Sequence, residues 1–199
     1  MTNELQTLSP EAQDLLFREA RTANAFTDEP VTDEQVAAIY DLMKFGPTAM
    51  NNQPLRILMV REGDARDRLL KHMADGNRDK TANAPLVAVL AADTDFHENL
   101  ERTFPHFPGA RDLFVDAAAR EQAARFNATL QIGYFLIAAR AAGLAAGPMG
   151  GFDAAGIDAE FFAGTPLRSL LVVNLGRPAE NAWFDRLPRL EQAEVVLDA

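Results

Sequence analysis

The segment Gly46–Pro54 places uncharged hydrogen-bonding side chains between two prolines, in the order Gly-Pro-Thr-Ala-Met-Asn-Asn-Gln-Pro. Its hydroxyl and carboxamide groups both donate and accept hydrogen bonds without carrying charge. A loop of this kind could therefore recognise the edge of a flat heteroaromatic ring. The alternative is an ordinary polar turn between a helix and a strand, because Gly, Pro and Asn are common turn residues.

Four further segments carry groups that could bind an anion or a ring. Arg21–Asn24 offers a guanidinium fork and a hydroxyl, which suit phosphate oxygens. Asn77–Lys80 places a carboxamide and an ammonium group three residues apart. The glycines of Gly147–Phe152 permit close approach to the backbone, and Arg186–Pro188 supplies another guanidinium. Each segment alone is typical of a surface helix, a helix end or a glycine turn.

The bulk composition limits the classes of function. The chain has 199 residues, which fit one domain over residues 1–199 with a substantial core. A net charge of −10 opposes nucleic-acid binding through a basic surface. The absence of cysteine excludes a disulfide framework and a thiolate nucleophile. The histidines lie too far apart along the chain to indicate a catalytic triad or a metal site: His72, His97 and His106.

We expect a cytoplasmic protein that does not cross a membrane. The first residues, Met-Thr-Asn-Glu-Leu-Gln, are polar and lack the apolar centre of a signal peptide. No apolar run approaches the ~20 residues that a membrane-spanning helix needs.

Alternating helical and strand patterns surround these segments and predict an α+β fold. Helices are expected at residues 9–23, after Thr32 or Asp33, within 63–75, at 117–142, and from 153 to about 162. Strands are expected at residues 55–60, 86–91 and 167–175, and the second of them should be central and buried on both faces. Residues 94–116 should form an irregular lid. A doubly wound sheet is also compatible with this order, although no Gly-x-Gly-x-x-Gly follows a strand.

The long helix expected at residues 117–142 has an apolar stripe at helical spacing. Its members are Phe126, Leu130, Gly133, Tyr134, Ile137, Ala138 and Ala141. The stripe could pack inside the chain or form a dimer interface, and the pattern leaves both open.

Taken together, the five segments resemble the nitroreductase family of FMN-dependent oxidoreductases. Pro47–Pro54 is similar to the family signature Pro-Ser-Ser-x-Asn-x-Gln-Pro, and the other four segments follow in the family's order. The resemblance covers roughly residues 12–190. It implies a three-layer α-β-α sandwich with a central, mostly antiparallel sheet, and a homodimer that holds FMN at the subunit interface.

The resemblance also implies which residues contact FMN. They are Arg21, Thr22, Asn24, Pro47, Thr48, Ala49, Asn51, Asn77, Lys80, Met149, Gly150, Gly151 and Arg186. Pro47, Thr48, Ala49 and Asn51 would reach the flavin of the neighbouring subunit. The chain departs from the family pattern at Asn24, where a basic residue is common, and at Ala49, where serine is common.

Two further departures fall later in the chain. Many family members have Glu at the position of Gly150, and they have a phosphate-binding Lys at the position of Phe184. Arg189 is a candidate replacement for that Lys.

The finer pattern is similar to one branch of the family, the reductases of malonic semialdehyde in uracil breakdown. Segments at Asn24–Phe26, Lys44–Thr48, Phe104–His106, Ala146–Met149 and Arg186–Leu190 carry this likeness. It implies ping-pong hydride transfer from NAD(P)H through FMN to a small aldehyde acid, giving 3-hydroxypropanoate, with no side-chain nucleophile.

Two lid residues could contact the substrate, and two other functions remain open. His106 could donate to a substrate carbonyl, or be a plain loop histidine, and Arg111 could bind a carboxylate. The alternatives are a broad nitroaromatic or quinone reductase and a non-catalytic flavin-binding protein.

Overall fold

Four antiparallel strands form one sheet in the order β1-β2-β4-β3. The computed structural model describes residues 6–199, so most of the polar N-terminal run lies outside the described residues. The strands are β1 (Leu55–Val60), β2 (Leu86–Asp93), β3 (Ala145–Met149) and β4 (Leu167–Gly176). The antiparallel pairing confirms the predicted mostly antiparallel sheet.

Strand β2 is the centre of the sheet because its sequence is almost entirely aliphatic. All eight of its residues are buried, and it pairs with β1 on one side and β4 on the other. Ala88 faces Met59 of β1 and Val173 of β4 across the two ladders. A strand covered on both faces does not need to alternate apolar and polar residues. The prediction of a central, doubly buried strand is therefore confirmed.

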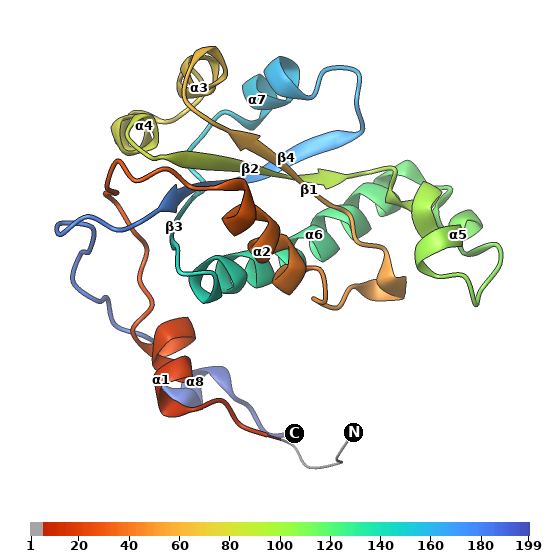
Figure 1. The fold of residues 1–199 in the computed structure, drawn as a ribbon. Coiled ribbons are helices and arrows are strands. Elements are labelled where there is room, and N and C mark those ends of the chain that lie inside the picture. Colours follow the sequence, from red (N-terminus) through yellow and green to blue (C-terminus); the bar gives the residue numbers. More distant parts are fainter. Residues whose placement is uncertain (1–5) are drawn as a thin grey trace.

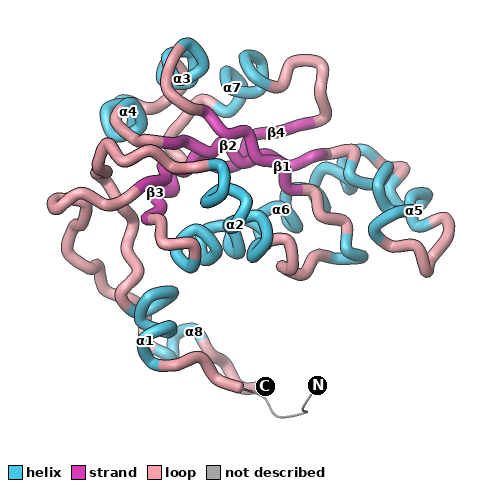
Figure 2. Tube along the Cα trace, viewed as in Figure 1, coloured by secondary structure: helices cyan, strands magenta, loops and turns pink. Residues whose placement is uncertain are grey.

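Helices cover both faces of the sheet and complete the predicted three-layer α-β-α arrangement (Figures 1 and 2). One layer holds α2 (Asp33–Met43) and α6 (Ala117–Ala141), and the other holds α3 (Asp64–Leu70), α4 (Asp75–Ala82) and α7 (Ala154–Phe161). Helix α2 begins at Thr32, whose hydroxyl accepts the amide of Gln35 while the Gln35 side chain accepts the Thr32 amide. This capping box fixes where the helix starts.

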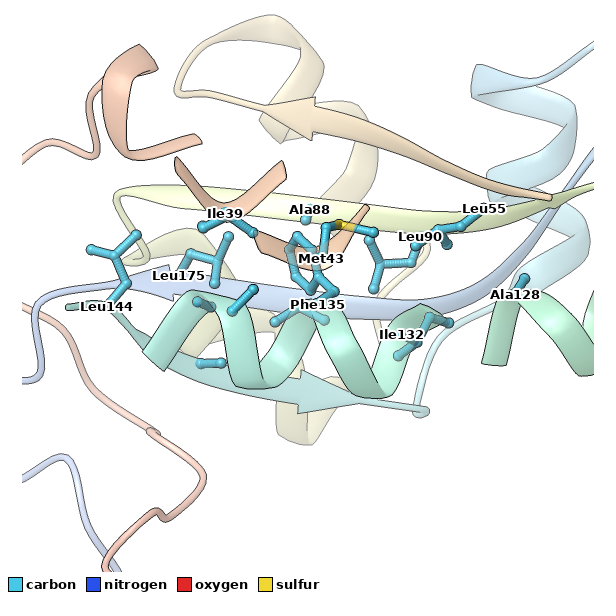
Figure 3. Packing of buried hydrophobic residues seen from close by; sticks show 14 of the residues in the cluster. Ile39, Met43, Leu55, Ala88, Leu90, Ala128, Ile132, Phe135, Leu144 and Leu175 are labelled. Atoms are coloured by element: carbon cyan, nitrogen blue, oxygen red, sulfur yellow. The ribbon is translucent and has the colours of Figure 1, made fainter. Parts of the chain in front are cut away.

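The larger core lies between the sheet and the layer of α2 and α6. Figure 3 shows Ile39 and Met43 of α2 and Phe135 of α6 packed against Leu90 and Leu175 of the sheet. These five side chains are at most 3% exposed. Burying a side chain of this size contributes about 1.5–3 kcal/mol, so this layer provides much of the fold's stability.

The N-terminal helix is shorter than predicted. Ser9 caps α1 (Pro10–Gln13), and one π-helical turn (Asp14–Arg18) follows it. The prediction of a helix to residue 23 is wrong because the following segment leaves the helix to lie along β3. There the amide of Ala23 donates to the carbonyl of Ala146 at 3.0 Å.

The predicted irregular lid contains short helices. They are a 3-10 turn at Phe96–Asn99, α5 (Leu100–Thr103) and a second 3-10 turn at Ala110–Phe114. The rings of Phe96 and Phe114 meet edge to face at 4.9 Å between centroids, which ties the two turns together. Elsewhere, a 3-10 turn occupies Ala49–Asn51, and α8 (Gln192–Val195) lies near the C-terminus.

Helix α6 carries apolar residues on two faces. The face toward the sheet buries residues such as Ala128 and Phe135. Most of the predicted stripe lies on the other face, where Phe126, Leu130 and Tyr134 are 64%, 43% and 42% exposed. Internal packing within one chain therefore does not account for this stripe.

Candidate functional site

The segment before α2 and the C-terminal segment meet beside β3. The Asn24 amide donates to the carbonyl of Ala182 at 2.9 Å, and Nη1 of Arg21 donates to the carbonyl of Phe184 at 3.3 Å. These bonds join parts of the chain that are more than 150 residues apart in sequence. They bring Arg21 and Arg186 to the rim of one hollow.

This hollow could hold a phosphate group. It has a volume of about 210 Å³, and its lining includes five of the polar residues singled out in the sequence: Arg21, Thr22, Asn24, Arg186 and Arg189. The lining contains three guanidinium groups and one carboxylate, that of Asp185, so its net charge is positive. Guanidinium forks and a hydroxyl donor match phosphate oxygens. Nη1 of Arg189 already donates to the carbonyl of Leu187 at 2.8 Å, so its fork is partly engaged.

The glycine turn after β3 contacts α4. Nδ2 of Asn77 donates to the carbonyl of Gly151 at 2.9 Å. A Cβ on Gly151 would lie 2.6 Å from that Nδ2, so a larger residue would displace the Asn77 side chain. Gly150 is exposed, with open space around it. The turn is thus hydrogen-bonded to Asn77 and keeps an accessible backbone at Gly150.

The other two predicted cofactor-binding residues of this region, Met149 and Lys80, differ in how far their side chains are buried. Met149 is 6% exposed, and its Sδ lies 3.7 Å from the Thr81 hydroxyl, so its side chain belongs to the core. The Lys80 carbonyl accepts Nδ2 of Asn174 at 3.1 Å, which fixes the end of α4. The Lys80 side chain is half-buried.

Gly147 joins the glycine turn to the N-terminal segment. A Cβ at this position would lie 2.4 Å from the carbonyl oxygen of Ala23. Only a residue without a side chain permits this contact. Contacts between neighbouring segments therefore connect four of the five predicted segments. Arg21–Asn24 packs on Gly147 of β3 and shares the hollow with Arg186, and Asn77 is bonded to Gly151.

The fifth segment, the loop Gly46–Pro54, lies elsewhere in the same chain. It follows α2 on the side of α5, well away from α1 and the C-terminal segment (Figure 1). Nδ2 of Asn51 donates to the carbonyl of Thr103 at 2.8 Å, which attaches the loop to α5. The predicted contact residues Pro47, Ala49 and Asn51 are exposed.

Backbone strain is concentrated in this loop. Met50, Asn51 and Gln53 all have positive φ angles, between 42° and 52°, although none is glycine. Such conformations cost of order 1–3 kcal/mol each and persist only when the surroundings impose them. The Thr48 hydroxyl helps by accepting the Gln53 amide at 3.2 Å.

Two buried carboxamide side chains on α6 hold this loop, and the sequence analysis did not predict their role. Oδ1 of Asn127 accepts the amide of Ala49 at 2.8 Å, and Oε1 of Gln131 accepts the amide of Leu55 at 2.9 Å. Both side chains are at most 5% exposed. The available signal was a pair of amides four residues apart on one face of an apolar helix.

We expect Asn127→Leu to loosen the loop. The variant leaves the Ala49 amide without its acceptor, at a cost of about 1–3 kcal/mol. Urea unfolding followed by circular dichroism measures this loss. Thr129→Ala is the control on the same helix, because the Thr129 hydroxyl only donates to the carbonyl of Arg125 at an exposed position. Equal midpoints for Asn127→Leu and Thr129→Ala would show that Asn127 does not support the loop.

The predicted substrate residues lie in the lid and are partly engaged. The exposed ring of His106 packs on Phe104, with 4.0 Å between centroids. Nη2 of Arg111 pairs with Glu98 at 2.6 Å, so a substrate carboxylate would compete with that partner. Neither residue lies at the hollow formed by the chain ends. Their substrate roles stay predictions.

Two kinds of site are not found in the part of the chain that the structure describes. Within residues 6–199 there is no cluster of three metal-binding side chains. Over the same residues, no helix combines the length and apolar character required to cross a membrane.

Comparison of the chain with known proteins shows its similarity to one family. A model described as "Nitroreductase family" matches residues 17–177. A Streptomyces griseus protein named "Putative NADH dehydrogenase/NAD(P)H nitroreductase" is 64% identical over 192 residues, which cover 95% of this chain and 96% of the relative.

Solved structures show the same fold in complexes with FMN. A protein of Exiguobacterium sibiricum solved with FMN superimposes with a TM-score of 0.82 at 17% identity, covering 98% of this chain and 99% of that chain. A Desulfovibrio desulfuricans protein, also solved with FMN, gives 0.68 at 25% identity, covering 97% and 98%. With the family model matching most of its length and a relative this similar over nearly all of it, the chain belongs to the nitroreductase family.

Proposed function

We propose that this protein is an FMN-dependent oxidoreductase that uses NAD(P)H. The observation that carries the proposal is the convergence of Arg21, Thr22 and Arg186 in one net-positive hollow. Family membership supports it, as do the FMN complexes of two structural neighbours and the NAD(P)H named for the Streptomyces griseus relative.

Each region of the site has a role in holding the flavin. Arg21 and Arg186 would bind the phosphate through charge-assisted hydrogen bonds. The backbone of Gly150 and Gly151 would lie against the ring, since no side chain prevents close approach. The ammonium group of Lys80 would stabilise negative charge near the pyrimidine end of the ring.

The protein positions the reactants, and the cofactor supplies the chemistry. Bound FMN would supply hydride transfer between the nicotinamide and a second substrate, in a ping-pong cycle. The chain's own residues bind the phosphate, orient the ring and shape the space for each substrate in turn. No side-chain nucleophile is required.

A second copy of the chain would complete the site. The loop Gly46–Pro54 carries flavin-contacting residues in the proposal, yet it lies away from the phosphate hollow of its own chain. Helix α6 exposes Phe126, Leu130 and Tyr134 on its outer face, and neighbouring exposed apolar side chains of this size are typical of a protein interface. Both observations support a homodimer in which α6 packs at the interface and the loop reaches the partner's flavin.

We expect Leu130→Glu to produce a monomer that does not retain FMN. A carboxylate in the centre of an apolar interface would be desolvated without a partner, which is strongly unfavourable. Size-exclusion chromatography with light scattering measures the mass, and absorbance near 450 nm measures bound flavin. Ala155→Glu on α7, an exposed position of the opposite layer, is the control and should remain a yellow dimer. A Leu130→Glu variant that stays a yellow dimer would contradict this interface.

For the substrate, we propose malonic semialdehyde, reduced to 3-hydroxypropanoate in pyrimidine catabolism, with a cytoplasmic location. The support is the likeness of five segments to that branch. A broad nitroaromatic or quinone reductase is the second candidate. It is favoured by the NAD(P)H nitroreductase named as a relative and by the lid residue Phe107, whose ring is 47% exposed and could stack on an aromatic substrate.

Anaerobic stopped-flow spectroscopy tests the function. Mixing the FMN-loaded protein with NADH or NADPH should bleach the flavin, and an acceptor added next should restore its colour. Faster reoxidation by malonic semialdehyde than by a nitroaromatic supports the first candidate, and the reverse order supports the second. Flavin that stays oxidised with both nicotinamides would indicate a non-catalytic flavin-binding protein.

A further inference from the structure

A second polar cavity lies behind the loop Gly46–Pro54, apart from the phosphate hollow. It has a volume of about 470 Å³ and is bounded by α2, β1, α5 and α6, with Asn52 and Gln53 on the loop side. The hollow at the chain ends shares no lining residue with it. The cavity is therefore a separate feature of the fold.

The charge of this cavity is opposite to that of the whole protein. Its lining includes Lys44, Arg56 and Arg102 and no carboxylate, whereas the chain carries a net charge of −10. The Lys44 ammonium hydrogen-bonds Asp41 outside the lining at 2.6 Å, which raises the pKa of Lys44 and keeps it protonated. The lining itself therefore presents only positive and neutral groups, and the carboxylates that pair with Lys44 and Arg56 lie outside it.

Among these cations, Arg102 is the one most available to a ligand. Arg56 is held by Asp93 at 2.6 Å. Nη2 of Arg102 donates to Oδ1 of Asn99 at 3.1 Å, and among the described residues no carboxylate lies within ion-pair distance of its guanidinium. An exposed planar fork without a carboxylate partner is suited to phosphate oxygens.

Asn52 adds an unusual feature to the lining. Its side chain is 2% exposed, and neither carboxamide atom has a hydrogen-bond partner within the described part of the chain. A buried amide without partners is unfavourable, and such groups generally have a function to explain them. Asparagine recognises the edge of adenine with one donor and one acceptor, and a turn of the buried carboxamide toward the lining would present both.

We propose that this cavity binds the adenosine phosphate half of the nicotinamide donor. Arg102 and Lys44 take the phosphates, Asn52 takes the base edge, and the Tyr40 ring, 58% exposed at the rim, offers a stacking surface. The volume is far larger than a three-carbon acid needs, which favours a nucleotide over the aldehyde acid.

The position of the cavity fits this role, and here the inference rests on the proposed function. Asn52 directly follows Asn51, a proposed contact to the partner's flavin. A dinucleotide with its nicotinamide on that flavin can extend past the loop and place its other half in the cavity. The nicotinamide would then be held at the flavin by binding energy from the distant half.

Anaerobic reduction of the FMN-loaded protein by two hydride donors tests the proposal. In Arg102→Ala, the apparent Kd for NADH or NADPH, whichever the parent prefers, should rise about tenfold, with the limiting bleaching rate unchanged. Reduced nicotinamide mononucleotide lacks the adenosine half, so its apparent Kd should be the same in Arg102→Ala and the parent. Arg177→Ala, at an exposed arginine paired with Glu29, is the matched control and should behave as the parent.

Asn52→Leu provides a second, independent readout. Removing the unpartnered amide should raise the midpoint of thermal unfolding and still weaken dinucleotide binding several-fold. A merely structural Asn52 would change the midpoint without changing the apparent Kd. An unchanged dinucleotide Kd in both Arg102→Ala and Asn52→Leu would overturn the proposal. So would slower reoxidation of dithionite-reduced Arg102→Ala by malonic semialdehyde with unchanged dinucleotide binding, because the cavity would then serve the acceptor.

Calorimetry with ADP separates this inference from the proposed function. ADP should bind the FMN-loaded parent and should bind Arg102→Ala about tenfold more weakly. If no nicotinamide bleaches the flavin yet ADP binds in this way, the proposed oxidoreductase function fails and the nucleotide cavity stands. If the nicotinamides bleach the flavin but ADP does not bind, the cavity assignment fails and the oxidoreductase function stands.

Discussion

Gly147→Ala is expected to lower the stability of the protein and to disorder the phosphate-binding segment. The new Cβ would lie 2.4 Å from the carbonyl oxygen of Ala23, and the backbones of both residues are held by hydrogen-bonded neighbours in and beside the sheet. Overpacking of this kind costs about 1–3 kcal/mol, and more where backbone must shift. For a chain of this size each kcal/mol lowers Tm by about 2–4 °C.

The expected damage reaches the proposed cofactor site. To relieve the contact, the segment must separate from β3 and break the bond between the Ala23 amide and the Ala146 carbonyl, which displaces Arg21. FMN affinity should fall together with Tm, as measured by fluorescence titration and calorimetry. Gly150→Ala is the control for stability, because no atom lies within 4 Å of its added Cβ. Equal Tm values for the two variants would refute the packing argument.

Arg186→Ala should weaken FMN binding about 10- to 100-fold without unfolding the protein. The side chain is exposed, so its removal leaves no cavity in the core. Losing a charge-assisted pair to a phosphate costs about 1.5–3 kcal/mol, and each 1.4 kcal/mol is tenfold in Kd. Dialysis followed by measurement of the yellow colour, and titration of the apoprotein with FMN, give the change in affinity.

A second variant, Arg189→Ala, tests whether Arg189 also binds the phosphate. Arg189 lines the same hollow but already donates to the carbonyls of Leu187 and Pro188. A loss of affinity equal to that of Arg186→Ala would identify Arg189 as the replacement for the Lys that Phe184 displaces. An Arg186→Ala protein that retains as much FMN as the parent would remove Arg186 from the proposed site.

Local sequence determined most of the elements. The aliphatic run of β2 could only be a strand covered on both faces, and Thr32 with Gln35 set the start of α2. Where the sequence failed, long-range contacts were the reason. The helix expected to reach residue 23 ends at Arg18, because pairing with β3 competes for the segment that follows. The lid looked irregular because its turns are tied by rings of Phe96 and Phe114 rather than by periodic packing.

By itself, the sequence determined the family resemblance and the residue types of the proposed site, because a motif is defined by the order and spacing of residues along the chain. The tertiary structure alone decided which segments meet: contacts between neighbouring segments connect four of the five, while the Gly46–Pro54 loop is held elsewhere by Asn127 and Gln131. It alone also showed that most of the apolar stripe of α6 faces outward. The physical reason is that helical periodicity gives the angle between side chains, whereas the side that packs inward depends on elements distant in the sequence.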